Sequence, residues 1–203
     1  MDAYEAEQRA AEKRSAELFS LGWQAGVGAT VWARAASDEL ERHQAARQAW
    51  AATPTRELWE RLHASAMMAV VAVDLVLSFE KRVRKLTGDA ELQKARQEFD
   101  RAVPQTEALR DLIAHLDEYA VGQGQRQVGK RLPPMKSEPV SALLYWTETG
   151  HSWISLGDAQ VGLEAAVQAA SALAEIVERV RERHLTTVSL AANEALRRRF
   201  GSN

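Results

Sequence analysis

The stretch AMMAVVAVDLVL, residues 66–77, sets the fold class because it is apolar on almost every side of a helix. It lies in the middle of the longest uninterrupted helical segment, from about Pro54 to Leu86, and Gly88 provides the stop. A helix of this kind is normally covered by other helices. We therefore expect an all-α antiparallel bundle with long helices and one small β-hairpin insertion. The residues expected on its core face are Trp59, Leu62, Ala66, Ala69, Val70, Val73, Leu77 and Val83.

Asp74 is the one charged residue in that stretch. An unpaired buried charge is costly, so its carboxylate must find a partner or reach water. We expect Asp74 to belong to a buried polar network; the alternative is that it assists a functional site. The charge and the shortness of the apolar run also argue against a membrane span, and no membrane association is expected.

Two helices are expected on the N-terminal side. The first covers residues 2–20, and the second starts after Ser37, a good N-cap, and ends near Ala51. Between them, residues 22–28 contain three glycines, which indicate a bend or a helix–helix contact. They do not form a phosphate-binding loop, because no apolar strand precedes them and no Lys-Ser/Thr pair follows.

Two more helices are expected on the C-terminal side, one from Asp89 to about Val103 and one from Pro104 to Gly122. Pro104 suits the first turn of a helix, and Gly122 can adopt the left-handed conformation that ends one. The apolar stripe of the second helix consists of Leu109, Leu112, Ile113, Leu116 and Ala120.

The other face of the helix from Pro104 to Gly122 carries Arg110, Asp111 and His115. Arg110 and His115 diverge by roughly 140° around the helix axis, so they flank the polar face from opposite sides. Asp111 is one turn before His115 and would orient its imidazole. The plainer interpretation is a solvated helix face with one charge-paired histidine. Arg110 and His115 are both expected to be exposed, so alanine at either should alter stability by no more than about 0.5 kcal/mol.

Residues 110–115, RDLIAH, resemble the R-polar-x-x-x-H motif of the HEPN superfamily of small helical bundles. Many members of that family are metal-independent endoribonucleases, and two copies usually meet across a homodimer. The resemblance implies that Arg110 stabilises the scissile phosphate, that His115 assists proton transfer from the 2′-hydroxyl, and that Asp111 fills the polar position. It implies no cofactor and no metal. Arg179 and His184 have the same separation, but there the arginine is followed by a valine.

A basic loop is expected over residues 123–139, which contain glycines, two adjacent prolines and no periodicity. Its residues Arg126, Lys130 and Arg131 are candidate nucleic-acid contacts, because lysine and arginine supply the cations that bind phosphates. The plainer interpretation is a solvated connecting loop.

A β-hairpin is expected from about Leu143 to Leu156, where short aromatic and β-branched segments flank ETGH. Its tryptophans, Trp146 and Trp153, are expected to pin it to the bundle; stacking on bases is the alternative. Asp158 is expected to cap the last long helix. The apolar stripe of that helix is Val161, Ala165, Ala169, Leu173, Ile176, Val177 and Val180.

The composition is that of one helical domain of 203 residues. We divide it into N-terminal helices (1–51), a bundle core (53–122), the basic loop and hairpin (123–157) and the C-terminal helix (158–200). The net charge of −2 provides no global attraction to nucleic acid, so RNA binding needs a local patch. The chain has no cysteine, and its N-terminus is too charged for a signal peptide, so a cytoplasmic location is expected.

Two functions are consistent with these patterns. The first is an HEPN-like RNA-binding or metal-independent endoribonuclease domain of a toxin or defence system, a homodimer with an antitoxin or another protein as a further partner. The second is a non-catalytic helical dimerisation or interaction protein, in which Arg110 and His115 are merely charge-paired surface residues.

Overall fold

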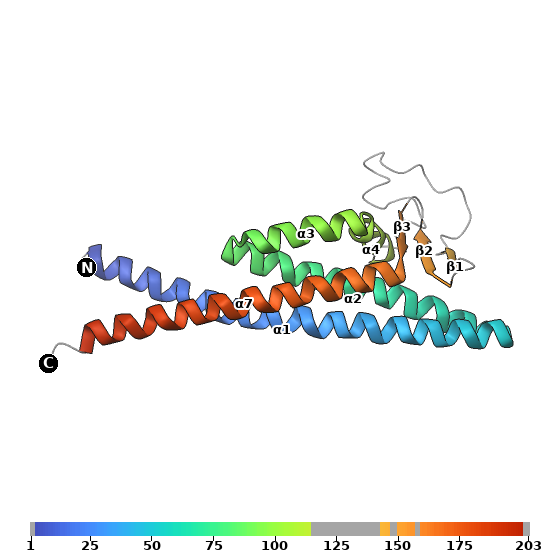
Figure 1. The fold of residues 1–203 in the computed structure, drawn as a ribbon, viewed down its shortest axis with the longest axis horizontal. Helices are drawn as coiled ribbons and strands as arrows, with labels where there is room; N and C mark the ends of the chain where they lie inside the picture. Colours follow the sequence, from blue (N-terminus) through green and yellow to red (C-terminus); the bar gives the residue numbers. More distant parts are fainter. Residues whose placement is uncertain (1–2, 115–142, 147–149, 157–158, 201–203) are drawn as a thin grey trace.

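The computed structural model describes residues 3–114, 143–146, 150–156 and 159–200, which form five helices and one three-stranded antiparallel sheet (Figure 1). The expected mostly helical bundle with a small hairpin is confirmed. The elements are α1 (Ala3–Ala52), α2 (Arg56–Thr87), α3 (Ala90–Ala102), α4 (Thr106–Ala114), β1 (Leu143–Trp146), β2 (Ser152–Leu156), β3 (Ala159–Gly162) and α7 (Leu163–Phe200).

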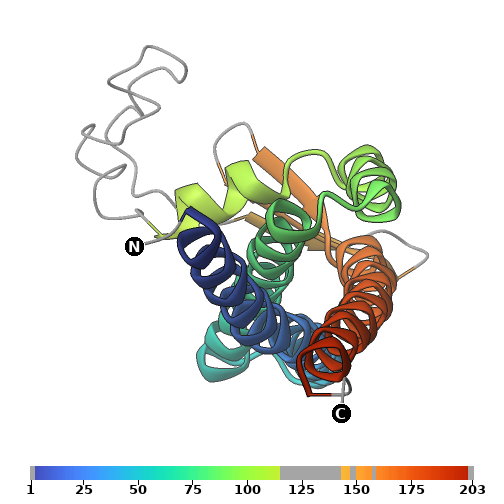
Figure 2. The ribbon, with the colours of Figure 1, turned by 90° about the vertical axis from the view of Figure 1, so that its left-hand side faces the viewer.

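Three long helices make the body of the bundle, with α1 packed against both α2 and α7. Both partners run antiparallel to α1, and the sheet lies where α7 begins (Figure 1). Seen along the bundle, α3 lies beside α7 and α4 lies beside α2 (Figure 2). The largest fully buried apolar side chains are Leu62, Leu77, Leu92, Leu109, Leu112, Ile154 and Leu163.

Helix α2 has well-formed ends. The Thr55 hydroxyl accepts from the Leu58 N–H at 3.2 Å, and Gly88 adopts a left-handed conformation with φ of 64° at the other end. The predicted core face is buried apart from Trp59, which is 38% exposed. The Trp59 ring instead contacts Trp50 of α1, with a centroid distance of 5.6 Å.

The central part of α2 is long and apolar enough to cross a membrane by length and composition alone. Slightly more than half of its most apolar window is buried inside the protein. This burial is typical of the core helix of a bundle, where the other helices take the place of lipid.

The prediction of two N-terminal helices is wrong, because α1 continues without a break through residues 22–28 and past Ser37. Ser37 donates its hydroxyl to the Ala33 carbonyl at 3.1 Å and is not a cap. Of the two interpretations of the glycines, the helix–helix contact is correct at Gly28. A Cβ there would lie 2.5 Å from the Phe79 ring of α2.

The predicted hairpin is confirmed by the antiparallel pairing of β1 with β2, in which Tyr145 lies opposite Trp153. The prediction that Asp158 caps the last helix is wrong, because β3 pairs with the free edge of β2 and α7 begins only at Leu163. An apolar residue such as Val161 suits either a helix or a strand, and the neighbouring edge selects the strand. The Trp153 ring lies against Gly162 of β3.

Candidate functional site

Arg110 and Asp111 are in the last turns of α4 as the structure describes it, and Ala114 is its final residue. The other predicted site residues lie outside the described residues: His115, Arg126, Lys130 and Arg131. The described part of the candidate site is therefore the Arg110 side of the helix.

Arg110 is held by a carboxylate from another helix. Leu109 and Leu112 are buried and press α4 against the bundle, which turns Arg110 toward α2. Its Nε lies 3.1 Å from Asp74 Oδ2, and its Nη1 lies 2.9 Å from Asp111 Oδ1. The side chain is 35% exposed, so Arg110 is neither a fully solvated residue nor a fully buried one.

Asp74 is the buried side of this contact, with only 10% of its side chain exposed. Burial raises the pKa of Asp74 above its ordinary value, although the neighbouring Arg110 guanidinium acts in the opposite direction. Asp74 therefore takes part in a polar contact between α2 and α4, as expected for a buried network. Shifted carboxyl groups of this kind are frequent at functional sites.

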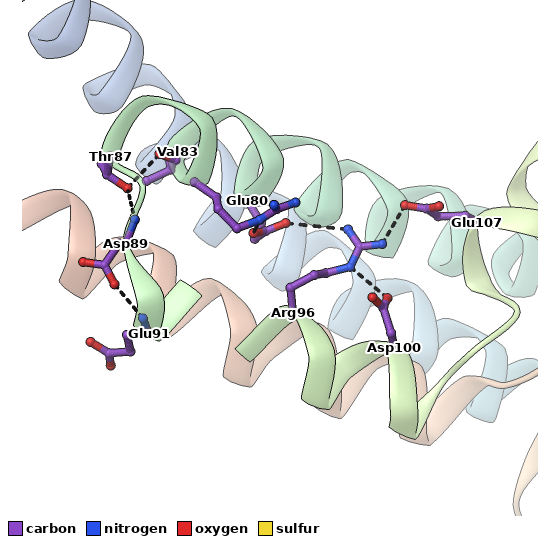
Figure 3. Close-up of polar contacts among 9 residues, drawn as sticks. Glu80, Val83, Thr87, Asp89, Glu91, Arg96, Asp100 and Glu107 are labelled. Atoms are coloured by element: carbon purple, nitrogen blue, oxygen red, sulfur yellow. Dashed lines mark hydrogen bonds and ion pairs between the residues drawn. The ribbon is translucent and has the colours of Figure 1, made fainter. Parts of the chain in front are cut away.

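A second charged cluster, centred on Arg96 of α3, holds the first turn of α4 (Figure 3). Arg96 donates to Asp100 at 2.8 Å and to Glu107 of α4 at 2.6 Å, and its Nη1 lies 3.6 Å from Glu80 Oε2. Glu80 is fully buried in α2 and also accepts from Arg84 at 2.6 Å. The Arg96 guanidinium holds the pKa of Glu107 below its ordinary value, against the effect of desolvation.

These two clusters fix the position of α4 on α2 and α3. Glu107 and Arg110 are three residues apart, so both charged contacts leave the same side of a short helix. Ion pairs at Glu107 and Arg110 thus hold α4 to α3 and α2, in addition to the burial of Leu109 and Leu112. The position of Arg110 is thus set by neighbouring helices and not by α4 alone.

The Arg110 guanidinium can also donate hydrogen bonds to a ligand. The ion pairs of Arg110 with Asp74 and Asp111 use its Nε and Nη1, and Asp111, which is 47% exposed, can turn into solvent and release Nη1. Asp74 is buried and lies 3.1 Å from Nε, but Nε makes no hydrogen bond in the described part of the chain, so Asp74 restrains the guanidinium by charge attraction on that side. A guanidinium fixed in this way can bind an oxyanion with two parallel N–H donors.

A third cluster of polar side chains, at the start of α7, was not predicted from the sequence. His43 of α1 is fully buried, and its Nδ1 donates to the Leu62 carbonyl at 3.1 Å. Glu164 of α7 accepts from the Ser152 N–H at 2.9 Å, and Arg47 donates to the Ser152 hydroxyl at 3.2 Å. The cluster therefore joins α1, α7 and β2.

Two buried atoms of this cluster, His43 Nε2 and Glu164 Oε1, have no hydrogen-bond partner in the described part of the chain. Burial lowers the pKa of His43 below its ordinary value, so the neutral imidazole is favoured. The signal that could have found His43 is its spacing, because it follows the buried Ala29 and Ala36 at seven-residue intervals.

No group of three histidine, aspartate or glutamate residues in the described ranges is arranged to hold a metal ion. No protein-family model, no curated protein and no solved structure matches the chain. The chemistry of the Arg110 site is therefore the basis for proposing a function.

Proposed function

We propose that the chain is an HEPN-type RNA-binding or RNA-cleaving domain in which Arg110 binds a phosphate and His115 transfers protons. The single observation that carries the proposal is the contact between Arg110 and the buried Asp74, with 35% of the arginine side chain left accessible. Burial makes the ionised Asp74 costly, and well-packed apolar residues would serve stability as well. We infer that the buried Asp74 serves to orient Arg110.

The proposed chemistry needs a cation and a proton carrier. Arg110 would neutralise the charge that develops on the phosphate, and an imidazole that titrates near neutral pH suits general acid–base transfer. His115 directly follows the last described residue of α4. Arg126, Lys130 and Arg131 are proposed as further phosphate contacts. A cytoplasmic homodimer, with an antitoxin or other protein partner, completes this proposal.

A non-catalytic helical interaction protein is the second candidate. The observation that favours it is the exposed apolar side chains of the neighbouring helices α1 and α2, where Val31 of α1 is 57% exposed and Met68 of α2 is 47% exposed. Exposed apolar surface of this kind marks an interaction site and does not require chemistry.

The first prediction separates the two candidates. We expect the wild-type protein to cleave mixed RNA in the presence of a chelator, and we expect Arg110→Ala and His115→Ala to lose cleavage by at least about 100-fold, the usual contribution of such groups. Cleavage is read from labelled RNA on gels, and folding of each variant is checked by circular dichroism.

The matched control is His184→Ala, from the arginine–histidine pair in α7. His184 Nε2 lies 3.5 Å from Asp89 at the start of α3, away from α4. This variant should cleave like wild type. If wild-type protein cleaves no RNA, or if His115→Ala cleaves as fast as wild type, the ribonuclease proposal is wrong and the interaction protein replaces it.

A further inference from the structure

The most apolar helix of the protein is covered on only part of its circumference. Slightly more than half of the apolar window of α2 is buried, and Met68 on its outer side is 47% exposed. Leu75 and Phe79 on the same side are only partly buried. Helices that are apolar all round are normally covered all round, and the described part of the chain covers this side incompletely.

The neighbouring helix α1 continues the same surface. Gly28 of α1 packs against Phe79 of α2, so the outer sides of the two helices adjoin. Residues at spacings of four, seven or fourteen lie on one side of a helix. We call the resulting surface the α1–α2 face, and it consists of Val27, Val31, Ala45 and Ala49 of α1 with Ala64, Met68, Leu75 and Phe79 of α2.

The two ends of the α1–α2 face differ. At one end, Val27 and Val31 are exposed on α1. At the other end, a groove of about 540 Å³ lies between α1 and α2, and its floor is mostly small apolar side chains. The groove is lined chiefly by Ala45, Ala46, Ala49, Leu58, Ala64 and Met68.

We propose that the α1–α2 face binds the same face of a second copy of this chain in an antiparallel arrangement. A two-fold axis between the ends of the face would bring Val27 and Val31 of each copy to the groove of the other. Such a contact is isologous, so each protomer contributes a projecting end and a hollow. This inference does not depend on RNA chemistry.

The size of the face is of the same order as the surface that each partner buries in a standard dimer. Val27 and Ala49 are 22 residues apart, which is roughly 33 Å along a helix, and two helices side by side are about 20 Å wide. The face therefore projects over about 600 Å², and its corrugated accessible area is larger. A standard interface buries about 800 Å² on each partner.

The charges around the groove favour a protein partner over a membrane. The rim carries both signs, since Arg42 pairs with Glu39 on α1 and Arg61 pairs with Glu57 on α2. A second copy can meet these charges with opposite ones. A helix that lies on an anionic membrane is instead bordered by an excess of lysine and arginine.

The oligomeric state tests the proposal directly. Wild-type protein should behave as a dimer of roughly twice 22.5 kDa in sedimentation or light scattering at micromolar concentration. The double variant Val31→Glu/Met68→Glu should be a monomer of unchanged helicity, because both positions are exposed in the single chain. The matched control is Leu190→Glu at an exposed apolar residue of α7, which should remain a dimer.

Crosslinking tests the antiparallel arrangement, because the chain has no cysteine of its own. Mixing Val31→Cys protein with Ala49→Cys protein should give a disulfide-linked dimer on mild oxidation. Within one chain these two positions are roughly 27 Å apart along α1, too far for a disulfide. Ala165→Cys, an exposed position on α7, should not crosslink to Val31→Cys.

A monomeric wild type at about 100 μM would overturn the proposal, and so would a Val31→Glu/Met68→Glu variant that stays dimeric. Co-flotation of monomeric wild type with phosphatidylcholine–phosphatidylserine vesicles would assign the face to a membrane instead. These readouts use no RNA. A monomeric wild type would also remove the homodimer from the proposed function, whereas the cleavage assay with Arg110→Ala and His115→Ala tests the RNA chemistry separately.

Discussion

The Asp74 carboxylate sits in the apolar centre of α2 and is balanced by a guanidinium from α4. Desolvation raises its pKa, and Arg110 offsets only part of that effect. Without Arg110, the buried Asp74 charge would therefore lower the stability of the fold at neutral pH. This dependence makes the contribution of Arg110 to stability larger than its position on a polar helix face predicts.

The second prediction is that Arg110→Ala lowers the free energy of unfolding by about 1–3 kcal/mol at pH 7, because it leaves Asp74 buried without its partner. The structure thereby replaces the sequence-based expectation of about 0.5 kcal/mol. Urea unfolding followed by circular dichroism measures the change. The control is Asp74→Asn/Arg110→Gln, which removes both charges and should be less destabilised. Equal stability of Arg110→Ala and wild type would show that the ion pair does not form.

The third prediction concerns His43, which faces Arg47 of α1, His63 of α2 and Glu164 of α7. Burial lowers the pKa of His43 in the folded state, so below about pH 6.5 the unfolded chain binds this proton more readily than the folded one. The contribution of His43 to stability is therefore complete above that pH and is lost as the pH falls toward the lowered value.

Urea unfolding at pH 7.5 and pH 5.5 measures this dependence. The loss of stability between the two pH values should be smaller in His43→Gln than in wild type. An unchanged difference in His43→Gln would contradict the assignment.

Among the helices, α1 shows how packing overrides local signals. It is 50 residues long and contains three glycines that would favour a break in isolation. Contacts with α2 and α7 along its length compensate for that weakness. At Gly28 the missing side chain is also useful, because it allows the Phe79 ring to approach the α1 backbone.

The fourth prediction is that Gly28→Ala and Phe79→Ala are energetically coupled. In wild type, the new methyl group would lie 2.5 Å from the Phe79 ring, and the ring must move, which offsets the gain of about 1 kcal/mol in helix propensity. In the Phe79→Ala background that clash is absent. Gly28→Ala should therefore be at least about 1 kcal/mol more favourable there, measured in a double-mutant cycle of unfolding free energies. Additive effects would show that the two residues do not touch.

For the molecule as a whole, the candidate site and the α1–α2 face lie on different sides of α2. Asp74 and Met68 are six residues apart, so their side chains diverge by about 120° around the helix axis. Asp74 contacts α4, whereas Met68 belongs to the exposed side beside α1. A dimer formed through this face therefore leaves Arg110 accessible.

The fifth prediction follows from this separation. The Val31→Glu/Met68→Glu variant should retain RNA cleavage within about threefold of wild type while losing the dimer, because it changes no residue near Arg110. Single-turnover cleavage at a concentration where the variant is monomeric measures this. Complete loss of cleavage with the fold intact would mean that the active site needs the second copy.

The local sequence was sufficient where the chain contains its own start and stop signals. Gly88 ends α2 and Asp89 caps α3, as expected, and the pairing of β1 with β2 follows from two short aromatic and β-branched segments. These signals act within a few residues, so they operate in nearly any surroundings. The fold class also followed, because an all-apolar helix requires other helices to cover it.

Contacts between residues distant in the sequence could not be predicted in this way. The unbroken α1, the strand β3, the pairing of Asp74 with Arg110 and the burial of His43 all depend on which surface lies beside each residue. Each of these surfaces belongs to another element. The residue types and their spacing thus determined the helices and their apolar sides. The partners of the buried charges were determined by packing, because a buried charge pairs with the group that folding brings within reach.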